Sequence, residues 1–423
     1  MPREDRELIA YVDGIRVGRF RQNVHGAITF RYDHDVDPQG TPLSIAMPLV
    51  PGAEYRNRVA RPFLQGLLTD NPATLAALAA QHHTTAGSPM NLLEHVGRDT
   101  AGALQLLPPG VPSDDATERT GDIEWIDDLD GLIADVAADA AEWVRTRDGI
   151  RWSLAGAQPK LALFRADDGR WGIPRDSTPT THILKPAAHG GRHDVNEFLA
   201  MRAARHLGLD VADHGILTTS HGDHVFVSRR YDRVMVDGRL ARLHQEDFAQ
   251  ALSVDPVHKY QADGGPGVGD FARVLAAMPP SAQAGARRSL FDALVFSVAA
   301  INTDAHAKNY AVVHLRGQMR LAPLYDLGSN ALYQGQAPLV SAVTLGGERR
   351  IEHIARPQFE KVARMLKVDT GEATDRVDHI TSGVAEAFVA ARHDLVADAG
   401  GEEYADRLVD AVAGRARARG WRA

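Results

Sequence analysis

The sequence predicts an α+β protein that begins with a small mixed unit and ends in a mainly helical part. Short apolar runs at 8–12 and 27–32 are bounded by turn residues, which is typical of strands, and residues 63–81 show helical spacing. Beyond Gln245 most apolar residues recur at the spacing of helices. A chain of 423 residues exceeds what one core usually supports, so we expect two or three subdomains.

Shifts in composition indicate where these parts begin and end. Residues 108–122 are rich in Pro, Gly, Asp and Ser, which is typical of a connection on the surface, and the acidic, Ala-rich stretch 127–144 predicts an exposed helix. Strand-like runs broken by Gly and Pro then continue to about Val227. The predicted parts are a subdomain at 1–110, a linker with an acidic helix at 111–148, a sheet-containing lobe at 149–235 and a helical lobe at 236–423.

Charge and cysteine content exclude several classes of function. The formal net charge of −8 argues against binding nucleic acid through an overall basic surface. The absence of cysteine excludes disulfides, thiolate metal sites and a cysteine nucleophile, and it fits a reducing cytoplasm. The N-terminus has no apolar run typical of a signal peptide, and the most apolar stretch, 290–301, is too short to span a membrane. We therefore expect a cytoplasmic protein with no membrane partner and no structural metal.

The octapeptide NTDAHAKN at 302–309 carries the most chemical information. It places Asn309 five positions after Asp304, which is the spacing of the catalytic loop in protein kinases. Asp304 would then be the catalytic base, Asn309 a metal ligand and Lys308 a cation beside the transferring phosphoryl group. We also assign His306 to the nucleotide site. Taken alone, the octapeptide is equally compatible with a polar turn between a helix and a strand.

A second carboxylate stands in a kinase-like context. Asp326 opens the tripeptide Asp-Leu-Gly, which resembles the Asp-Phe-Gly of kinases, where the Asp binds magnesium. Strand-like runs between Asn309 and Asp326 predict a β-hairpin that brings the two residues together. Taken alone, an Asp-x-Gly after a strand is more often an ordinary turn.

Two upstream segments have the chemistry to hold phosphates. The segment SLAGAQPK at 153–160 offers small residues through which backbone N–H groups can approach a phosphate, although Pro159 has no N–H to donate. Lys185 ends an apolar strand, where its charge needs an anionic partner. Glu197 begins the following helix and could pair with Lys185 as in kinases, or the two could form an ordinary surface ion pair.

In this order, the segments resemble the motif series of the HipA family of bacterial toxin serine/threonine kinases. The motifs are SLAGAQPKLALF, THILKPA, NEFLAMRAARHLGL, FVSRRYDR, HQEDFAQAL, INTDAHAKNYAVV and LAPLYDLGSN. The N-terminal unit matches through DGIRVGRF, PLSIAMPL, FLQGLLTDNP and LLEHVGRDTAGALQLLP. The resemblance spans nearly the whole chain, so the sequence is identified as a full-length member of this family.

The resemblance implies a two-lobed protein-kinase-like fold, distantly related to the phosphatidylinositol kinases, with an extra N-terminal α+β subdomain and a mainly helical C-terminal lobe. It implies ATP and Mg2+ as cofactors, with Asp304 as base and with Asn309 and Asp326 as magnesium ligands. The segment FVSRRYDR would connect the lobes and meet adenine through its backbone. The residues expected at the ATP site are Ala155, Gly156, Ala157, Gln158, Lys160, Lys185, Glu197, Phe226, Val227, Ser228, Arg229, Tyr231, Asp232 and His306.

The resemblance also implies regulation and partners. Family members autophosphorylate a serine at the phosphate loop, which matches Ser153, and the added charge is expected to eject the loop and silence the kinase. A dimeric helix-turn-helix antitoxin of the HipB type would bind the kinase and carry it to operator DNA. The implied substrate is an aminoacyl-tRNA synthetase, with glutamyl-tRNA synthetase favoured, in a toxin–antitoxin system linked to persistence.

Two other functions stay open on the sequence. A small-molecule phosphotransferase of the aminoglycoside kinase type uses a similar Asp-to-Asn loop, but it usually carries His at the position of Asn302. A nucleotide-binding co-repressor, acting with a DNA-binding antitoxin, would not need Asp304, Asn309 and Asp326. Such a role could also coexist with kinase activity.

Overall fold

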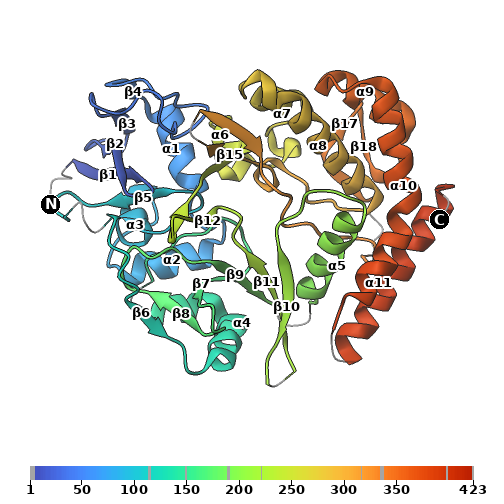
Figure 1. Cartoon of the computed structure of the whole chain (residues 1–423), viewed down its shortest axis with the longest axis horizontal. Helices are drawn as coiled ribbons and strands as arrows, with labels where there is room; N and C mark the ends of the chain where they lie inside the picture. Colours follow the sequence, from blue (N-terminus) through green and yellow to red (C-terminus); the bar gives the residue numbers. More distant parts are fainter. Residues whose placement is uncertain are drawn as a thin grey trace. The chain divides into compact units, whose positions relative to one another are not determined.

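The computed structural model describes residues 5–112, 116–147, 150–187, 191–220, 222–315, 317–333, 338–396 and 399–421. The chain folds into two compact units, each built from three separate stretches of sequence (Figure 1). The first unit comprises 1–185, 229–257 and 311–319, and the second comprises 186–228, 258–310 and 320–423.

The first unit begins with a five-stranded antiparallel sheet in the order β4-β3-β2-β1-β5. Phe20 and Phe30 lie on adjacent strands with ring centroids 4.7 Å apart, and Phe63 of the first helix stacks on Phe20 at 6.4 Å. Burial of these rings holds the helix on the sheet. The elements are β1 (Arg6–Val12), β2 (Ile15–Gln22), β3 (Ile28–Tyr32), β4 (Glu54–Tyr55), α1 (Asn57–Gly66), α2 (Pro72–Gln81), α3 (Pro89–Val96) and β5 (Leu104–Leu107).

The single helical stretch expected at 63–81 is wrong, because two helices occupy it. α1 ends at Gly66, and α2 begins at Pro72. Asn71 caps α2 by accepting hydrogen bonds from the backbone N–H groups of Ala73 and Thr74, at 2.9 and 3.2 Å. Proline favours the first position of a helix, so Asn71-Pro72 starts a new helix here. Residues 67–71 form a non-helical α1–α2 connection.

The rest of the first unit carries a second sheet, in which β9, β7, β8 and β6 are neighbours in that order. Residues 108–122 are more than the surface connection that we expected, because Ala116 is fully buried against Tyr11 and Leu107. The elements are β6 (Ile123–Trp125), α4 (Leu129–Thr146), β7 (Leu161–Arg165), β8 (Trp171–Pro174), β9 (His182–Pro186), β12 (Arg233–Val236), β13 (Arg239–Arg242), β14 (His244–Asp247), α6 (Phe248–Ala251), β15 (Ala311–Leu315) and β16 (Gln318–Leu321).

The second unit is mainly helical. Its long helix α10 packs against α5, α8, α9 and α11, and α10 and α11 lie side by side in the red part of the chain (Figure 1). The apolar run at 290–301 is a buried helix as predicted, because residues 290–299 of α8 are all buried. The elements are α5 (His193–His206), β10 (His214–Thr218), β11 (His224–Arg229), α7 (Val268–Ala276), α8 (Pro280–Ala299), β17 (Val340–Leu345), β18 (Glu348–Arg350), α9 (Arg356–Leu366), α10 (Thr370–His393) and α11 (Ala399–Ala418), with short 3-10 helices η2 (Pro256–His258), η3 (Gln261–Asp263), η4 (Ala307–Asn309) and η5 (Ile351–His353).

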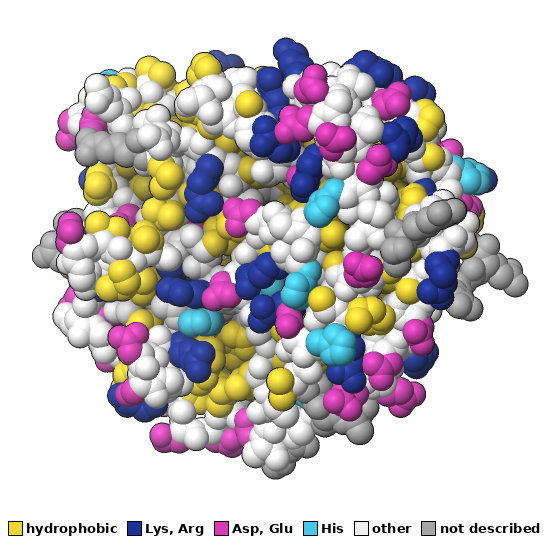
Figure 2. Space-filling model, turned by 45° about the vertical axis from the view of Figure 1, so that its right-hand side comes forward, with side chains coloured by type: hydrophobic (Ala, Val, Ile, Leu, Met, Phe, Trp, Pro, Cys, Tyr) yellow, Lys and Arg dark blue, Asp and Glu magenta, His cyan; other side chains and the backbone are white. Residues whose placement is uncertain are grey.

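The surface agrees with the weakly acidic composition. On the face shown in Figure 2, basic and acidic side chains are interspersed and do not gather into one large patch of a single sign. Within the described ranges, no helix combines the length and the apolar character needed to cross a membrane.

Candidate active site

The octapeptide after α8 is held in one conformation by local hydrogen bonds. Ile301 has a φ of 59°, in the left-handed region, so the chain leaves the helix in a sharp turn. The N–H of Asn302 donates to the Ser297 carbonyl at 2.7 Å, and its side-chain Oδ1 accepts from the N–H of Asp304 at 2.9 Å. Asn309 Nδ2 closes the turn by donating to the Asp304 carbonyl at 2.8 Å. Asp304 and Asn309 are therefore brought together, as their spacing predicted.

The side chains of this segment differ in their exposure to solvent. The Asp304 side chain is 55% exposed, whereas His306, Lys308 and Asn309 are buried. Tyr260 donates a hydrogen bond from its hydroxyl to Asp304 Oδ1, and its ring lies edge-on to His306 at 4.8 Å. Asp304 thus presents a solvent-accessible carboxylate that a neighbouring phenol orients, which is the arrangement a general base needs.

Asp326 belongs to the same cluster. Tyr325 donates from its hydroxyl to the Lys308 carbonyl at 2.8 Å, which ties the Asp-Leu-Gly segment to the octapeptide. The predicted hairpin is present, because β15 and β16 are neighbours in the sheet β14-β15-β16. Asp326 itself has a φ of 57°, a conformation that costs energy for a non-glycine residue and is frequent at functional sites.

The electrostatics of the cluster favour a neutral His306. Burial lowers the pKa of His306 below its ordinary value, and the negative charges of Asp304 and Asp326 oppose this shift. His306 Nδ1 and Asn302 Nδ2 are buried, and neither has a hydrogen-bond partner in the described part of the chain. Buried polar atoms without partners are costly, so these two suit contact with a bound ligand.

The predicted phosphate loop, residues 153–160, lies in the first unit and has a compact conformation. Ser153 is only 5% exposed, and its hydroxyl donates to the Leu67 carbonyl at 2.8 Å. Lys160 Nζ closes the loop by donating to the Ala155 carbonyl at 2.6 Å. Gly156 has a φ of 103°, and a Cβ at this position would lie 2.4 Å from Lys160 Nζ. The backbone conformation therefore favours glycine here, and a side chain would also displace the Lys160 amine.

A buried ion-pair network lies next to the start of this loop. Asp99 accepts from the N–H of Thr180 and pairs with Arg230, Arg233 and Arg242 at 2.8 to 3.3 Å. Burial alone would raise the pKa of the Asp99 carboxyl, but the three guanidinium charges outweigh it and hold the pKa well below its usual range. The backbone carbonyl of Asp99 also accepts from the N–H of Ser153 at 2.9 Å, so the network supports the start of the loop.

Comparison with known proteins identifies the family. Residues 8–107 match the HipA N-terminal domain and residues 152–391 match the HipA-like C-terminal domain. The Y4mE protein of Sinorhizobium fredii is 33% identical over 423 residues, covering 97% of this chain and 98% of its own length. The chain belongs to the HipA family.

Further relatives agree with this assignment. The serine/threonine-protein kinase toxin HipA of Shewanella oneidensis is 31% identical over 318 residues, covering 72% of this chain and 70% of its own length. The solved structure of Shewanella oneidensis HipA, in a complex with HipB and operator DNA, superposes with a TM-score of 0.83 at 23% identity and covers 97% of both chains. The predicted kinase-like α+β fold is confirmed, and this HipA-family chain is a kinase.

Several residues expected at the ATP site of this HipA-family kinase have other structural partners. The Phe226 side chain is fully buried and stacks on His214, with ring centroids 5.8 Å apart, so this side chain is not open to a nucleotide. The Asp232 carboxylate accepts from Arg230 at 2.8 Å and from the N–H of Gly102 at 2.7 Å. We therefore do not carry the Asp232 side chain forward as an ATP contact.

The remaining predicted residues differ in exposure. Ala157, Gln158 and Arg229 are exposed, and Val227 and Ser228 are partly exposed. Tyr231 donates to Gln245 Oε1. Lys185 at the end of β9 is half-buried and lies in the first unit, whereas Glu197 in α5 is buried and lies in the second. Their pairing stays a prediction.

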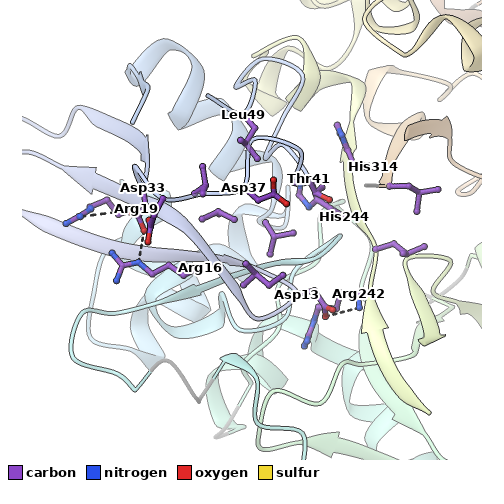
Figure 3. Close-up of a pocket in the computed structure, with 18 of the residues that line it drawn as sticks. Asp13, Arg16, Arg19, Asp33, Asp37, Thr41, Leu49, Arg242, His244 and His314 are labelled. Carbon is purple, nitrogen blue, oxygen red and sulfur yellow. Dashed lines mark hydrogen bonds and ion pairs between the residues drawn. The ribbon is translucent and has the colours of Figure 1, made fainter. Parts of the chain in front are cut away.

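A cavity of about 880 Å3 lies in the first unit and contains none of the predicted site residues (Figure 3). Asp33 lies between Arg16 and Arg19 at its edge and pairs with both. Asp13 accepts a hydrogen bond from the backbone N–H of Arg242 at 3.0 Å. Because these wall charges already have partners, we assign this cavity no part in phosphate transfer.

Proposed function

We propose that this HipA-family kinase transfers the γ-phosphoryl group of ATP to a serine or threonine of a protein, with Mg2+ as cofactor. The observation that carries the proposal is the cluster of the second unit, in which Asn309 and the Asp326 segment are both tied to the Asp304 turn. A base, a cation and two oxygen-bearing metal ligands are what phosphoryl transfer requires.

Each side chain of the cluster has a role in this proposal. Asp304 accepts the proton of the attacking hydroxyl, and the Tyr260 hydrogen bond orients its carboxylate. The buried Lys308 places a positive charge near the transferring group. Asn309 and Asp326 would hold Mg2+, which prefers oxygen ligands and, when bound, would neutralise charge on the phosphates.

The first unit supplies groups suited to the ATP phosphates. Ala157 and Gln158 are exposed residues, and their backbone N–H groups have no hydrogen-bond partner in the described part of the chain, so these groups are available to phosphate oxygens. We assign Lys185 to the phosphates as well, because a half-buried lysine is stabilised by an anion.

Ser153 is the proposed site of autophosphorylation. In the compact loop its hydroxyl is buried and donates to the Leu67 carbonyl, so a phosphate could not be accommodated there without moving the loop. A phosphoserine has no proton to donate at this position and carries roughly 1.5 to 2 negative charges. Phosphorylation would therefore expel the loop and reduce ATP binding.

We further propose that the kinase is the toxin of a toxin–antitoxin pair and acts in the cytoplasm. The Shewanella oneidensis relative is named a toxin, and its solved structure is a complex with HipB and operator DNA. A HipB-type helix-turn-helix partner is accordingly proposed for this chain, with operator DNA reached through that partner. The net charge of −8 fits indirect contact with DNA better than direct contact.

The proposed substrate class is aminoacyl-tRNA synthetases, with glutamyl-tRNA synthetase as the first candidate. The test is to incubate the purified kinase with ATP and Mg2+, together with either synthetases or aminoglycosides, and to locate the phosphate by mass spectrometry. We expect phosphoserine or phosphothreonine on a protein. Phosphate on an aminoglycoside alone would contradict the proposal and favour the small-molecule phosphotransferase.

A further inference from the structure

The α1–α2 connection, residues 67–71, lies along the phosphate loop within the first unit. Thr69 and Gly156 form a parallel β-bridge. The Thr69 hydroxyl donates to the Gly156 carbonyl at 2.9 Å, and the N–H of Asp70 donates to the same carbonyl at 3.1 Å. Asn71 Nδ2 donates to the Ala157 carbonyl at 3.3 Å. Together with the bond from Ser153 to Leu67, these contacts tie both ends of the connection to the loop.

These hydrogen bonds decide which way the loop's peptide groups face. The carbonyl oxygens of Gly156 and Ala157 point to the connection, and the Ala155 carbonyl is taken by Lys160. In a peptide chain, carbonyls that are held on one side leave neighbouring N–H groups for the other side, which is how a loop offers donors to an anion. Ala157 and Gln158 are exposed residues, and their backbone N–H groups, which have no hydrogen-bond partner among the described residues, are the donors that remain for an anion.

The connection itself is anchored. Asn71 Oδ1 caps α2 while Nδ2 of the same side chain holds the loop, so the loop is fixed to the end of a helix. On the other side, Gln250 of α6 donates to the Phe63 carbonyl of α1 at 3.0 Å. A Cβ at Gly66 would lie 2.6 Å from the Gln250 side chain, which shows how closely α1 approaches α6.

We propose that Thr69 and Asn71 are positioning residues for ATP: they hold the phosphate loop in the conformation that presents its N–H groups. The proposal rests on the proposed function, because it assumes that the loop binds ATP phosphates. It gives the N-terminal subdomain an indirect part in nucleotide binding, because the Thr69 side chain, 87 residues away from Gly156 in sequence, would act through the loop.

The test compares Thr69→Val with Thr69→Ser. Valine keeps the shape of threonine but has no hydroxyl, so we expect the KM for ATP to rise about fivefold, the factor that corresponds to one ordinary hydrogen bond, with kcat within about twofold of wild type. Serine restores the hydroxyl and should restore the KM.

Asn71→Asp keeps the helix cap but loses the amide donor, and it should raise the KM in the same way. Thr120→Val, at an exposed threonine of the same unit, is the matched control and should leave the KM unchanged.

A second measurement does not depend on activity. Hydrogen exchange of the amides of 153–160, without nucleotide, should be faster in Thr69→Val than in wild type and in Thr120→Val. Wild-type exchange together with a wild-type or lower KM in Thr69→Val would overturn the proposal. If calorimetry shows that wild type binds no ATP, the proposed function fails, and the nucleotide role of Thr69 and Asn71 fails with it. The exchange data would then still show whether the α1–α2 connection orders the loop.

Discussion

Asp99 is the residue with the most charged partners in the network behind the phosphate loop. Its carboxylate faces three arginines, and its side chain is 8% exposed. Asp232 supplies the second carboxylate, pairing with Arg230 at 2.8 Å and Arg233 at 3.2 Å. In a buried network of this kind the opposite charges neutralise one another, so removing one member leaves buried charges without a partner.

Asp99→Asn should therefore lower the free energy of unfolding by roughly 3 to 5 kcal/mol, because buried Arg242 would lose its carboxylate partner and Arg230 and Arg233 would be left with Asp232. Urea denaturation followed by circular dichroism measures the change. The matched control is Asp168→Asn, which removes an exposed carboxylate paired with Arg170 and should leave the free energy of unfolding nearly unchanged. A loss below about 1 kcal/mol in Asp99→Asn would show that the network does not support the fold.

At the scale of the element, the phosphate loop is proposed both to bind ATP and to carry the phosphorylation site that regulates the kinase. Its compact conformation depends on a hydroxyl, that of Ser153, which is also the proposed site of modification. The same group therefore cannot be phosphorylated and hold the loop at once. Loop opening must precede modification, since the hydroxyl is buried in the compact state.

Ser153→Ala should remain active during prolonged incubation with ATP and Mg2+, while wild type loses activity as phosphate accumulates. Ser153→Asp, with one negative charge, should bind ATP more weakly than Ser153→Ala. Time courses of transfer, combined with calorimetric titration of ATP, measure both effects. The control is Ser177→Ala, at another buried serine of the first unit. This variant should lose activity during the incubation at the same rate as wild type. Fully active wild-type protein with stoichiometric phosphate on Ser153 would refute this account.

Local patterns predicted the elements better than the contacts between them. The strands near 8–12 and 27–32, the buried helix at 290–301 and the Asp304 turn follow from apolar spacing and from residue types that are adjacent in sequence. The break between α1 and α2 was missed because apolar spacing continues on both sides of Asn71-Pro72, although that dipeptide is itself a signal for a helix start.

The missed parts of the candidate site are tertiary contacts. Tyr260 reaches Asp304 across 44 residues, and Thr69 reaches Gly156 across 87, so no local pattern marks either residue. The partners of Asp232 were missed for the same reason, because they include Gly102, which is 130 residues away. Family resemblance could place the motifs in order, but it could not say which partners each carboxylate has in the folded chain.

At the scale of the whole molecule, the proposed function uses residues of two units, and the chain passes into each unit more than once. The first contains the phosphate loop and the N-terminal subdomain that holds it, and the second contains the Asp304 cluster. The octapeptide leads directly from the second unit into β15 of the first, so a kinase of this design cannot be divided at a single point of the sequence. The central claim is that these parts serve one reaction, transfer of phosphate from ATP.

The most direct test of that claim is the initial rate at which labelled phosphate from the γ position of ATP appears on protein, compared between wild type, Asp304→Asn and Asp326→Asn. In the proposed function both side chains serve charge and metal binding, and neither is buried in the core, so both variants should melt like wild type while transfer is abolished. Asp168→Asn should transfer at the wild-type rate. If either variant of the cluster keeps more than about a tenth of the wild-type rate, a loss of only about 1.4 kcal/mol in barrier terms, that residue does not have the role assigned here.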